Sequence, residues 1–138
     1  MGQVRDIMEK NVITIEHDKS ALDASKLLKD KGISFVVITK NNDPIGLVSE
    51  RDIVRKIAAL DKKASEVSIE ELMSKNFHSV KSQDDIEMAI QKMLNNNIRR
   101  LLVLDNEKLE GVITQTDLTS FLRSKLLING MLEKLESD

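Results

Sequence analysis

Two short stretches of the sequence carry a hydroxyl and a carboxylate at the same spacing. Ser49 is followed three residues later by Asp52, and Thr114 is followed in the same way by Asp117. Each pair lies between an apolar run and a stretch that we expect to be helical. The unpaired N–H groups of a helix start favour a phosphate, which a hydroxyl can also contact, and a carboxylate suits the paired hydroxyls of a ribose. The spacing therefore predicts nucleotide binding at both places.

Basic residues strengthen this chemistry in the second stretch. The hairpin pairing that we predict, with Leu104 opposite Leu109, places Arg99 across from Thr114. Arg99 and Arg100 would then both reach the start of the helix, where arginine is well matched to phosphate. We expect this site, which also includes Thr116, to take phosphates better than the first.

The first stretch has a weaker set of groups for a phosphate. The same pairing places Ser34 across from Ser49, so serine replaces the arginine that the second stretch has there. Arg51 partly compensates for this loss, whereas Glu50 adds negative charge. We therefore expect the site around Asp52 to bind weakly, to bind a less charged adenosyl group, or to remain empty.

A purely structural explanation of the spacing stays open. Ser/Thr-x-x-Asp before an apolar helix is also a capping box, which contributes about 0.5–2 kcal/mol to stability. The pair Arg99-Arg100 could equally be the solvated start of a strand. One copy of the motif would favour capping, whereas two copies in the same setting favour binding.

Catalysis and metal binding find little support in the sequence. Glu50 and Asp52 are two carboxylates at a helix start, but the second stretch has Gln115 at the matching position, and no nucleophile accompanies them. His17 and His78 stand at no ligand spacing. We therefore expect no enzyme activity, no catalytic residues, no metal and no catalytic cofactor.

Both stretches belong to an internal repeat with a constant offset of 65 residues. Identical residues recur at this offset without a gap, at turn, cap and core positions, and this predicts two copies of one structural unit. The identical pairs are Met8/Met73, Lys10/Lys75, Asn11/Asn76, Ala24/Ala89, Ile33/Ile98, Asn41/Asn106, Gly46/Gly111 and Asp52/Asp117.

Each copy is predicted to fold as β-α-β-β-α. The expected strands are 12–15, 35–39 and 45–49 in the first copy and 77–80, 100–104 and 109–114 in the second. The first helix of each copy has a polar start, at Asp18 and Ser20 or at Asp84 and Asp85, and ends at Gly32 or Asn97 in a left-handed cap. The closing helices are expected at about 52–60 and 117–128. Apolar stripes run along the first helices, at Ala21, Ala24 and Leu28 and at Ile86, Ala89, Ile90, Met93 and Leu94.

The boundaries follow from these elements. We predict a first repeat at 1–60, a linker at 61–68, a second repeat at 69–128 and a C-terminal tail at 129–138. The tail follows a break at Asn129-Gly130 and is expected to be a helical appendage or a frayed end. Ser68 begins a capping box and a short helix that runs through Met73. Neither copy is large enough to be stable by itself, so we expect the two repeats to pack as a pseudo-two-fold intramolecular dimer. The predicted fold class is α/β (α+β).

The repeated pattern resembles a known family. Residues 46–52 and 111–117 each read glycine, two apolar residues, Ser or Thr, two variable residues and Asp, and segments 32–37 and 97–102 precede them. This sequence resembles the tandem cystathionine-beta-synthase-type (CBS) domain family, whose pairs form the Bateman module. The resemblance covers residues 4–128.

The resemblance implies a stand-alone regulatory module. Such pairs bind AMP, ADP, ATP, NAD or S-adenosylmethionine in the cleft between the repeats and signal to a separate effector protein, and they usually associate as homodimers. The adenine would lie against apolar residues that map here to Val12, Ile13 and Ile33 in one site and to Phe77, His78 and Ile98 in the other. The alternative is a ligand-free interaction or assembly module with structural repeats.

Composition excludes several other classes. The chain has 138 residues, no Cys, 3 Phe and a net charge of −2, and its apolar runs are too short for a membrane span. The even spread of charge and the scarcity of aromatic residues argue against nucleic-acid binding. Without cysteine, a reducing cytoplasm is the expected compartment.

Overall fold

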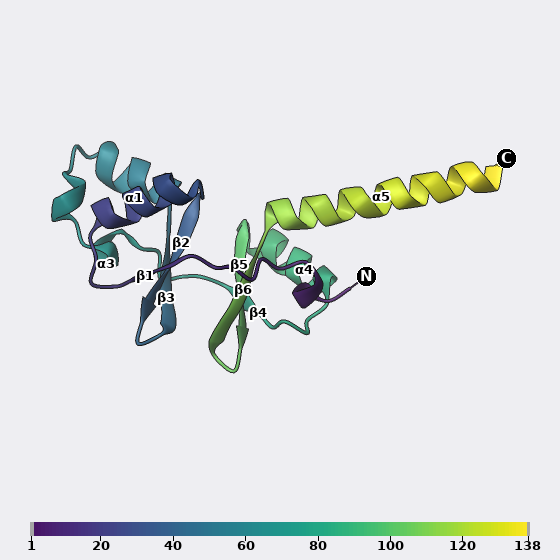
Figure 1. Cartoon of the computed structure of the whole chain (residues 1–138), viewed down its shortest axis with the longest axis horizontal. Coiled ribbons are helices and arrows are strands. Elements are labelled where there is room, and N and C mark those ends of the chain that lie inside the picture. The colour runs from purple at the N-terminus through teal and green to yellow at the C-terminus, as the bar shows by residue number, and fades with distance from the viewer. Residues whose placement is uncertain (1, 138) are drawn as a thin grey trace. The chain divides into compact units, whose positions relative to one another are not determined.

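The computed structural model describes residues 2–137, with side chains as far as residue 130, and divides the chain into two compact units (Figure 1). Unit 1 comprises Met1–Lys10, His78–Asp105 and Glu110–Asp138, and unit 2 comprises Asn11–Phe77 and Asn106–Leu109. Each unit has its own buried apolar core and a three-stranded sheet. The mixed α/β fold class is therefore confirmed.

Unit 2 contains the body of the first repeat. Its sheet has the order β1-β2-β3, with β1 parallel and β3 antiparallel to β2. Ala21, Ala24 and Leu28 of the first helix are buried, as predicted. The elements are β1 (Thr14–Glu16), α1 (Ala21–Lys31), β2 (Phe35–Lys40), β3 (Asp43–Ser49), α2 (Glu50–Ile53), a π-helical segment (Val54–Ala58), a 3-10 turn (Ala64–Glu66) and α3 (Ile69–Leu72).

Unit 1 repeats this order with one longer helix. Its sheet has the order β4-β5-β6, with β4 parallel to β5. The predicted order β-α-β-β-α is thus present in both repeats. The elements are a 3-10 turn (Val4–Asp6), β4 (Ser79–Val80), α4 (Ile86–Asn96), β5 (Arg100–Asp105), β6 (Lys108–Thr114) and α5 (Gln115–Ser137).

The predicted helix ends are confirmed by local geometry. The Ser20 hydroxyl caps α1 by accepting from the backbone N–H of Asp23 at 3.2 Å. Gly32 and Asn97 end α1 and α4 in the left-handed conformation, with φ of 63° and 50°. Ser68 caps α3, which ends at Leu72, one residue before the predicted end.

Two expectations about the helices are wrong. No break occurs at Asn129-Gly130, because α5 is continuous over Gln115–Ser137; an internal glycine costs a helix only about 1 kcal/mol relative to alanine. Leu94, expected on the buried stripe of α4, is 72% exposed at its edge. The closing helix of the first repeat begins at Glu50 and changes to π geometry at Val54. None of the helices in the part of the chain that the structure describes is long and apolar enough to cross a membrane.

The hairpin register differs by one residue from the prediction. The two-residue turn at Asn41 and Asn42 pairs Thr39 with Pro44, but a β-bulge after Ile38 shifts the rest of the ladder, so that Phe35 lies opposite Ser49. A bulge inserts one unpaired residue into a strand, and turn-based counting cannot detect it. Ser34 therefore does not face Ser49; its carbonyl instead accepts from the N–H of Glu50 at 2.9 Å.

The second repeat shows the same displacement. The Arg99 carbonyl accepts from the N–H of Gln115 at 2.9 Å, which is the contact of Ser34 and Glu50 moved by 65 residues. The predicted pairing of Arg99 with Thr114 is therefore also one residue out. Because a one-residue slip in a strand changes the face on which a side chain lies, Arg99 has different neighbours from those expected.

The N-terminal segment of the chain packs within unit 1, on the body of the second repeat. Val4 is fully buried, and its N–H donates to the Asp84 carbonyl at 2.8 Å. Glu9 and Val112 exchange two backbone hydrogen bonds of 2.8 and 3.0 Å. The start of the chain thus completes the second repeat.

The segment that leads into the second repeat packs in the equivalent way within unit 2. The N–H of Ile69 donates to the Lys19 carbonyl at 3.0 Å, and Ser74 exchanges bonds of 3.0 and 2.8 Å with Leu47. Ile69 and Leu72 are fully buried in the core of that unit. Residues 61–68, expected as a linker, therefore lead into a segment that completes the first repeat.

Glycine is required where the N-terminal segment passes over β6 and where the segment that leads into the second repeat passes over β3. A Cβ on Gly46 would lie 2.7 Å from Met73 Sδ and 2.9 Å from the Ser74 carbonyl. A Cβ on Gly111 would lie 2.9 Å from Met8 Sδ and 2.7 Å from the carbonyl of Glu9. The repeated glycine of the motif thus allows close approach of a backbone rather than a turn.

Candidate ligand sites

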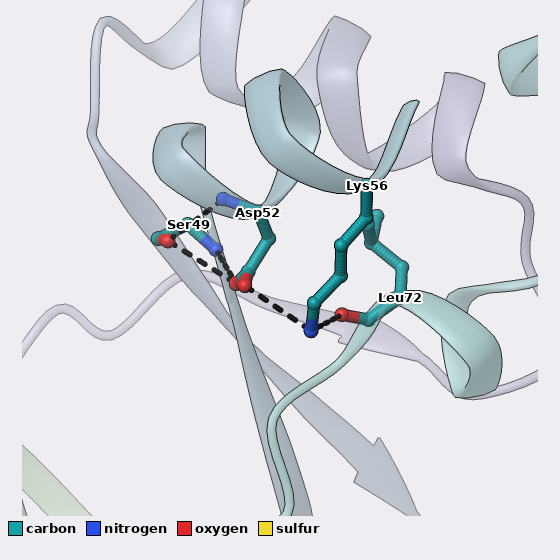
Figure 2. Close-up of polar contacts among 4 residues, drawn as sticks. All are labelled: Ser49, Asp52, Lys56 and Leu72. Atoms are coloured by element: carbon teal, nitrogen blue, oxygen red, sulfur yellow. Dashed lines mark hydrogen bonds and ion pairs between the residues drawn. The ribbon is translucent and has the colours of Figure 1, made fainter. Parts of the chain in front are cut away.

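Ser49 and Asp52 form a complete capping box at the start of α2 (Figure 2). The Ser49 hydroxyl accepts from the N–H of Asp52 at 3.3 Å, and Asp52 Oδ2 accepts from the Ser49 N–H at 2.8 Å and from its hydroxyl at 3.1 Å. The capping alternative is therefore realised. It engages Oδ2, whereas Oδ1 faces away from Ser49, toward Lys56.

Lys56 is a part of this site that the sequence reasoning missed. Its ammonium lies 3.4 Å from Asp52 Oδ1 and donates to the Leu72 carbonyl at 3.0 Å. Figure 2 shows the Asp52 carboxylate between the backbone of Ser49 and this ammonium. The Asp52 side chain is 18% exposed and that of Lys56 44%. The i, i+4 spacing of the two residues was the signal that could have revealed the pair.

The other predicted residues of the first-repeat site lie in the same unit. Ile13 is bonded to β2 of this unit, because its carbonyl accepts from the N–H of Val37 at 3.1 Å. Val12, Ile13 and Ile33 are half-buried, whereas Ser34 and Arg51 are exposed. Strand pairing thus brings the segment before β1, the entry to β2 and the start of α2 into one small unit.

Thr114 and Asp117 form the matching cap at the start of α5. Asp117 Oδ2 accepts from the Thr114 N–H at 2.9 Å, and the Thr114 hydroxyl accepts from the N–H of Asp117 at 3.2 Å. Among the residues that the structure describes, Asp117 has no lysine partner, because the position equivalent to Lys56 is Phe121, a half-buried residue of the unit 1 core. The two repeats therefore share the cap but differ in the charge beside it.

Arg99 lines a hollow of about 350 Å³ between α4 and α5. Its walls are mostly apolar, with Arg99, Asn97, Gln115 and Thr119 as the polar contributors; the apolar residues are Ile90, Met93, Leu94, Ile98, Leu118 and Leu122. Predicted site residues Ile98 and Arg99 thus share this hollow. Thr114 and Asp117 do not line it.

Thr116 lies in a different hollow of about 370 Å³, on the first turns of α5. Its other lining residues are Gln115, Thr119, Ser120 and Arg123, so it is polar and carries one cation. Gln115 and Thr119 line both hollows. The predicted groups around the start of α5 are therefore distributed over two neighbouring surfaces.

The remaining predicted residues lie where the chain enters β4 and β5. The His78 carbonyl accepts from the N–H of Leu102 at 3.0 Å, the counterpart of the contact of Ile13. Phe77 and His78 are half-buried, and Arg100, the counterpart of Phe35, begins β5. Phe77 ends the first segment of unit 2, whereas His78 begins the second segment of unit 1.

The acidic and histidine residues show no metal-like grouping in the described part of the chain. His17 Nδ1 lies 3.0 Å from Glu70 Oε1, so this side chain has a carboxylate partner on α3. Glu50, considered above with Asp52 as a carboxylate pair, is exposed.

Comparison with known proteins identifies the repeat. The family model described as "CBS domain" matches the chain twice, at residues 4–59 and 69–124. An uncharacterized protein of Methanopyrus kandleri is 32% identical over 117 residues, covering 83% of this chain and 60% of that protein. A homoserine O-acetyltransferase of Methanosalsum zhilinae is 29% identical over 121 residues, covering 86% of this chain. The chain spans only 24% of that enzyme, and less than two thirds of each of four curated relatives.

A solved structure gives chemical context. A CBS domain pair in complex with 5′-methylthioadenosine and S-adenosyl-L-methionine is 27% identical to this chain, with a TM-score of 0.81. The similarity covers 91% of this chain and 98% of that one. The fold of this chain is therefore similar over most of its length to that of a CBS domain pair with adenosyl compounds bound.

Proposed function

Because the chain belongs to the CBS domain family, in which a similar pair binds adenosyl compounds, we propose that it is a regulatory module that binds an adenosine-containing ligand. The candidates are AMP, ADP, ATP, NAD and S-adenosylmethionine. The observation that carries the proposal is the repeated cap: Asp52 and Asp117 are each fixed by a Ser or Thr through Oδ2, so that each carboxylate is held in place before a ligand arrives.

The ribose is the part of the ligand that these carboxylates suit best. A ribose offers two adjacent hydroxyl donors, and an ionised carboxylate offers only acceptors. Phosphate would be favoured at the second site, where Arg99 and Arg100 precede the start of the 23-residue helix α5, whose N-terminal dipole is also positive. The apolar residues that precede β1 and β4 supply surface for the adenine.

Signalling would follow from population shift. A ligand changes the balance between two conformations only by its differential affinity for them. The proposal includes a homodimer, a separate effector protein and a cytoplasmic location, and it assigns no catalytic role because no nucleophile or activated base accompanies the two carboxylates.

The test is thermal denaturation with adenosine, AMP, ADP, ATP, NAD and S-adenosylmethionine. A ligand that binds only the native state adds about 2.7 kcal/mol at a hundredfold excess over Kd, and we expect at least one compound to raise Tm. Asp117→Ala should weaken the response to phosphorylated ligands more than Asp52→Ala does. If no compound moves the wild type while both variants lose stability, the ligand-free assembly module is correct. Hydrolysis of the ligand would instead indicate an enzyme.

A further inference from the structure

Lys56 is a charged residue of the first-repeat site whose equivalent in the second repeat, Phe121, is uncharged. Its ammonium has three N–H donors, of which one is bonded to the Leu72 carbonyl at 3.0 Å and another points to Asp52 Oδ1 at 3.4 Å (Figure 2). The second repeat has Phe121 at this position, with the ammonium of Lys125 5.8 Å from the centre of its ring. Within the part of the chain that the structure describes, the first repeat thus carries an ammonium beside its carboxylate, whereas the second has an aromatic ring at the equivalent position.

The position of this cation does not depend on Asp52 alone. The Leu72 carbonyl lies on the segment that completes unit 2, and Leu72 itself is fully buried, so the acceptor that holds the ammonium is fixed. Asp52 Oδ2 is engaged by Ser49, which leaves Oδ1 as the oxygen that a ribose hydroxyl would reach first. A ribose bound there would lie next to the ammonium.

The charge balance at the site depends on Lys56. Glu50, Arg51 and Asp52 together supply two carboxylates and one guanidinium, so that without Lys56 the start of α2 would repel an anion. An ammonium about 6 Å from a phosphate changes affinity by about threefold when water fills the space between them, and by more where the dielectric constant is lower. The effect on an uncharged nucleoside at the same place would be much smaller.

We propose that Lys56 is the residue that sets the charge selectivity of the first-repeat site, allowing it to take a singly phosphorylated adenosyl ligand despite its two carboxylates. This inference rests on the proposed function. It replaces the expectation that Arg51 is the compensating cation of that site.

The experiment measures binding of adenosine and of AMP by calorimetry in the full chain. Asp117→Asn serves as the background because it weakens the second-repeat site while keeping an oxygen acceptor for the cap. In that background, Lys56→Gln keeps an N–H donor for the Leu72 carbonyl but removes the charge. We expect it to weaken AMP binding by about threefold to tenfold and adenosine binding by less than about twofold. Lys56→Arg should restore AMP binding, and Lys29→Met, at an exposed lysine of α1, should change neither.

Each outcome decides the matter. Equal weakening of both ligands by Lys56→Gln would assign Lys56 a merely structural role and overturn the inference. Unchanged binding of both ligands in Lys56→Gln would also overturn the inference. A loss of all binding in Asp117→Asn, while the wild type still binds, would overturn it as well. The proposed function would survive in each of these cases. If adenosine, AMP and every other adenosyl compound tested fail to bind the wild type, both the proposed function and this inference are wrong. Lys56→Met, with a melting curve to show that it folds, repeats the comparison.

Discussion

At the scale of single residues, capping and ligand binding are compatible roles for the same carboxylate. Asp52 and Asp117 each use Oδ2 to accept from the backbone of the residue three positions earlier. A carboxylate has two oxygens and about four acceptor positions, so the cap leaves capacity for hydroxyl donors. The choice between a structural and a functional interpretation of Ser/Thr-x-x-Asp is therefore a question for ligand titration.

Gly111 makes the sharpest prediction at this scale. Alanine there would place Cβ 2.7 Å from the Glu9 carbonyl and 2.9 Å from Met8 Sδ, so the N-terminal segment must shift. We expect Gly111→Ala to lower the free energy of unfolding by about 1–3 kcal/mol, measured by urea denaturation.

Gly130 is the matched control for this substitution. It lies in α5, and apart from its chain neighbours and the backbone of its own helix a Cβ there would meet nothing within 4 Å. Gly130→Ala should stabilise the protein by about 0.5–1 kcal/mol, since alanine is the better helix former. Equal effects of the two substitutions would show that the close approach at Gly111 has no energetic importance.

At the scale of elements, side chains tie the ends of neighbouring strands together. Ser82 follows β4 and Asp105 ends β5; the Ser82 hydroxyl donates to Asp105 Oδ2 at 2.6 Å and its N–H to Oδ1 at 3.0 Å. These two bonds, the hydroxyl bond first, hold the pKa of Asp105 below its ordinary value. The turn between β4 and α4 is thus fastened to the sheet by an ionised group.

The pH dependence of this tie can be predicted. Because the pKa of Asp105 is lower in the folded state, its contribution to stability is present above the ordinary aspartate pKa of about 4 and is lost as the pH falls through the lowered value. Ser82→Ala should raise the pKa of Asp105 and reduce the stability lost on acidification. NMR titration of the carboxyl carbons and urea denaturation at pH 6 and at about pH 3 measure both. Asp23, whose pKa Ser20 lowers, is the internal control and should not move; an unchanged Asp105 would contradict the prediction.

The sequence predicted those elements whose signals are local. Ser20, Gly32 and Asn97 were identified as helix ends because each acts on its own turn of backbone. The hairpin register was missed by one residue because the bulge after Ile38 depends on how two strands pair. The chemistry of the caps followed from residue types, whereas the position of Arg99 in an apolar hollow depends on the packing of α4 against α5.

At the scale of the whole molecule, the repeat in the sequence and the compact units of the structure are different divisions of the chain. Unit 2 is built from Asn11–Phe77 and four residues of the second repeat, not from residues 1–60. The buried residues Val67, Ile69, Leu72 and Met73 belong to its core although they lie beyond the first repeat. Contacts of this kind join distant parts of the sequence, and no local pattern of residues predicts them.

This division predicts how fragments behave. A fragment of residues 11–77 keeps the four buried apolar residues that complete unit 2, whereas 1–60 lacks them and carries an N-terminal segment that has lost its partners in unit 1. Each buried side chain of this size is worth about 1.5–3 kcal/mol. We therefore expect 11–77 to show more helical circular dichroism and better dispersed amide NMR signals than 1–60. If the 1–60 fragment is the better ordered one, the first structural unit ends before residues 61–68 and this prediction is wrong.

The packing of the N-terminal segment on the second repeat also determines when its contacts can form during synthesis of the chain. Unit 2 has nearly all of its residues once Phe77 has left the ribosome. Val4, in contrast, is bonded to Asp84 and Glu9 to Val112, so these residues are paired only after segments made much later have left the ribosome. Residues 4–9 therefore stay exposed to chaperones and proteases for longer than the residues of unit 2, most of whose partners are made by Phe77.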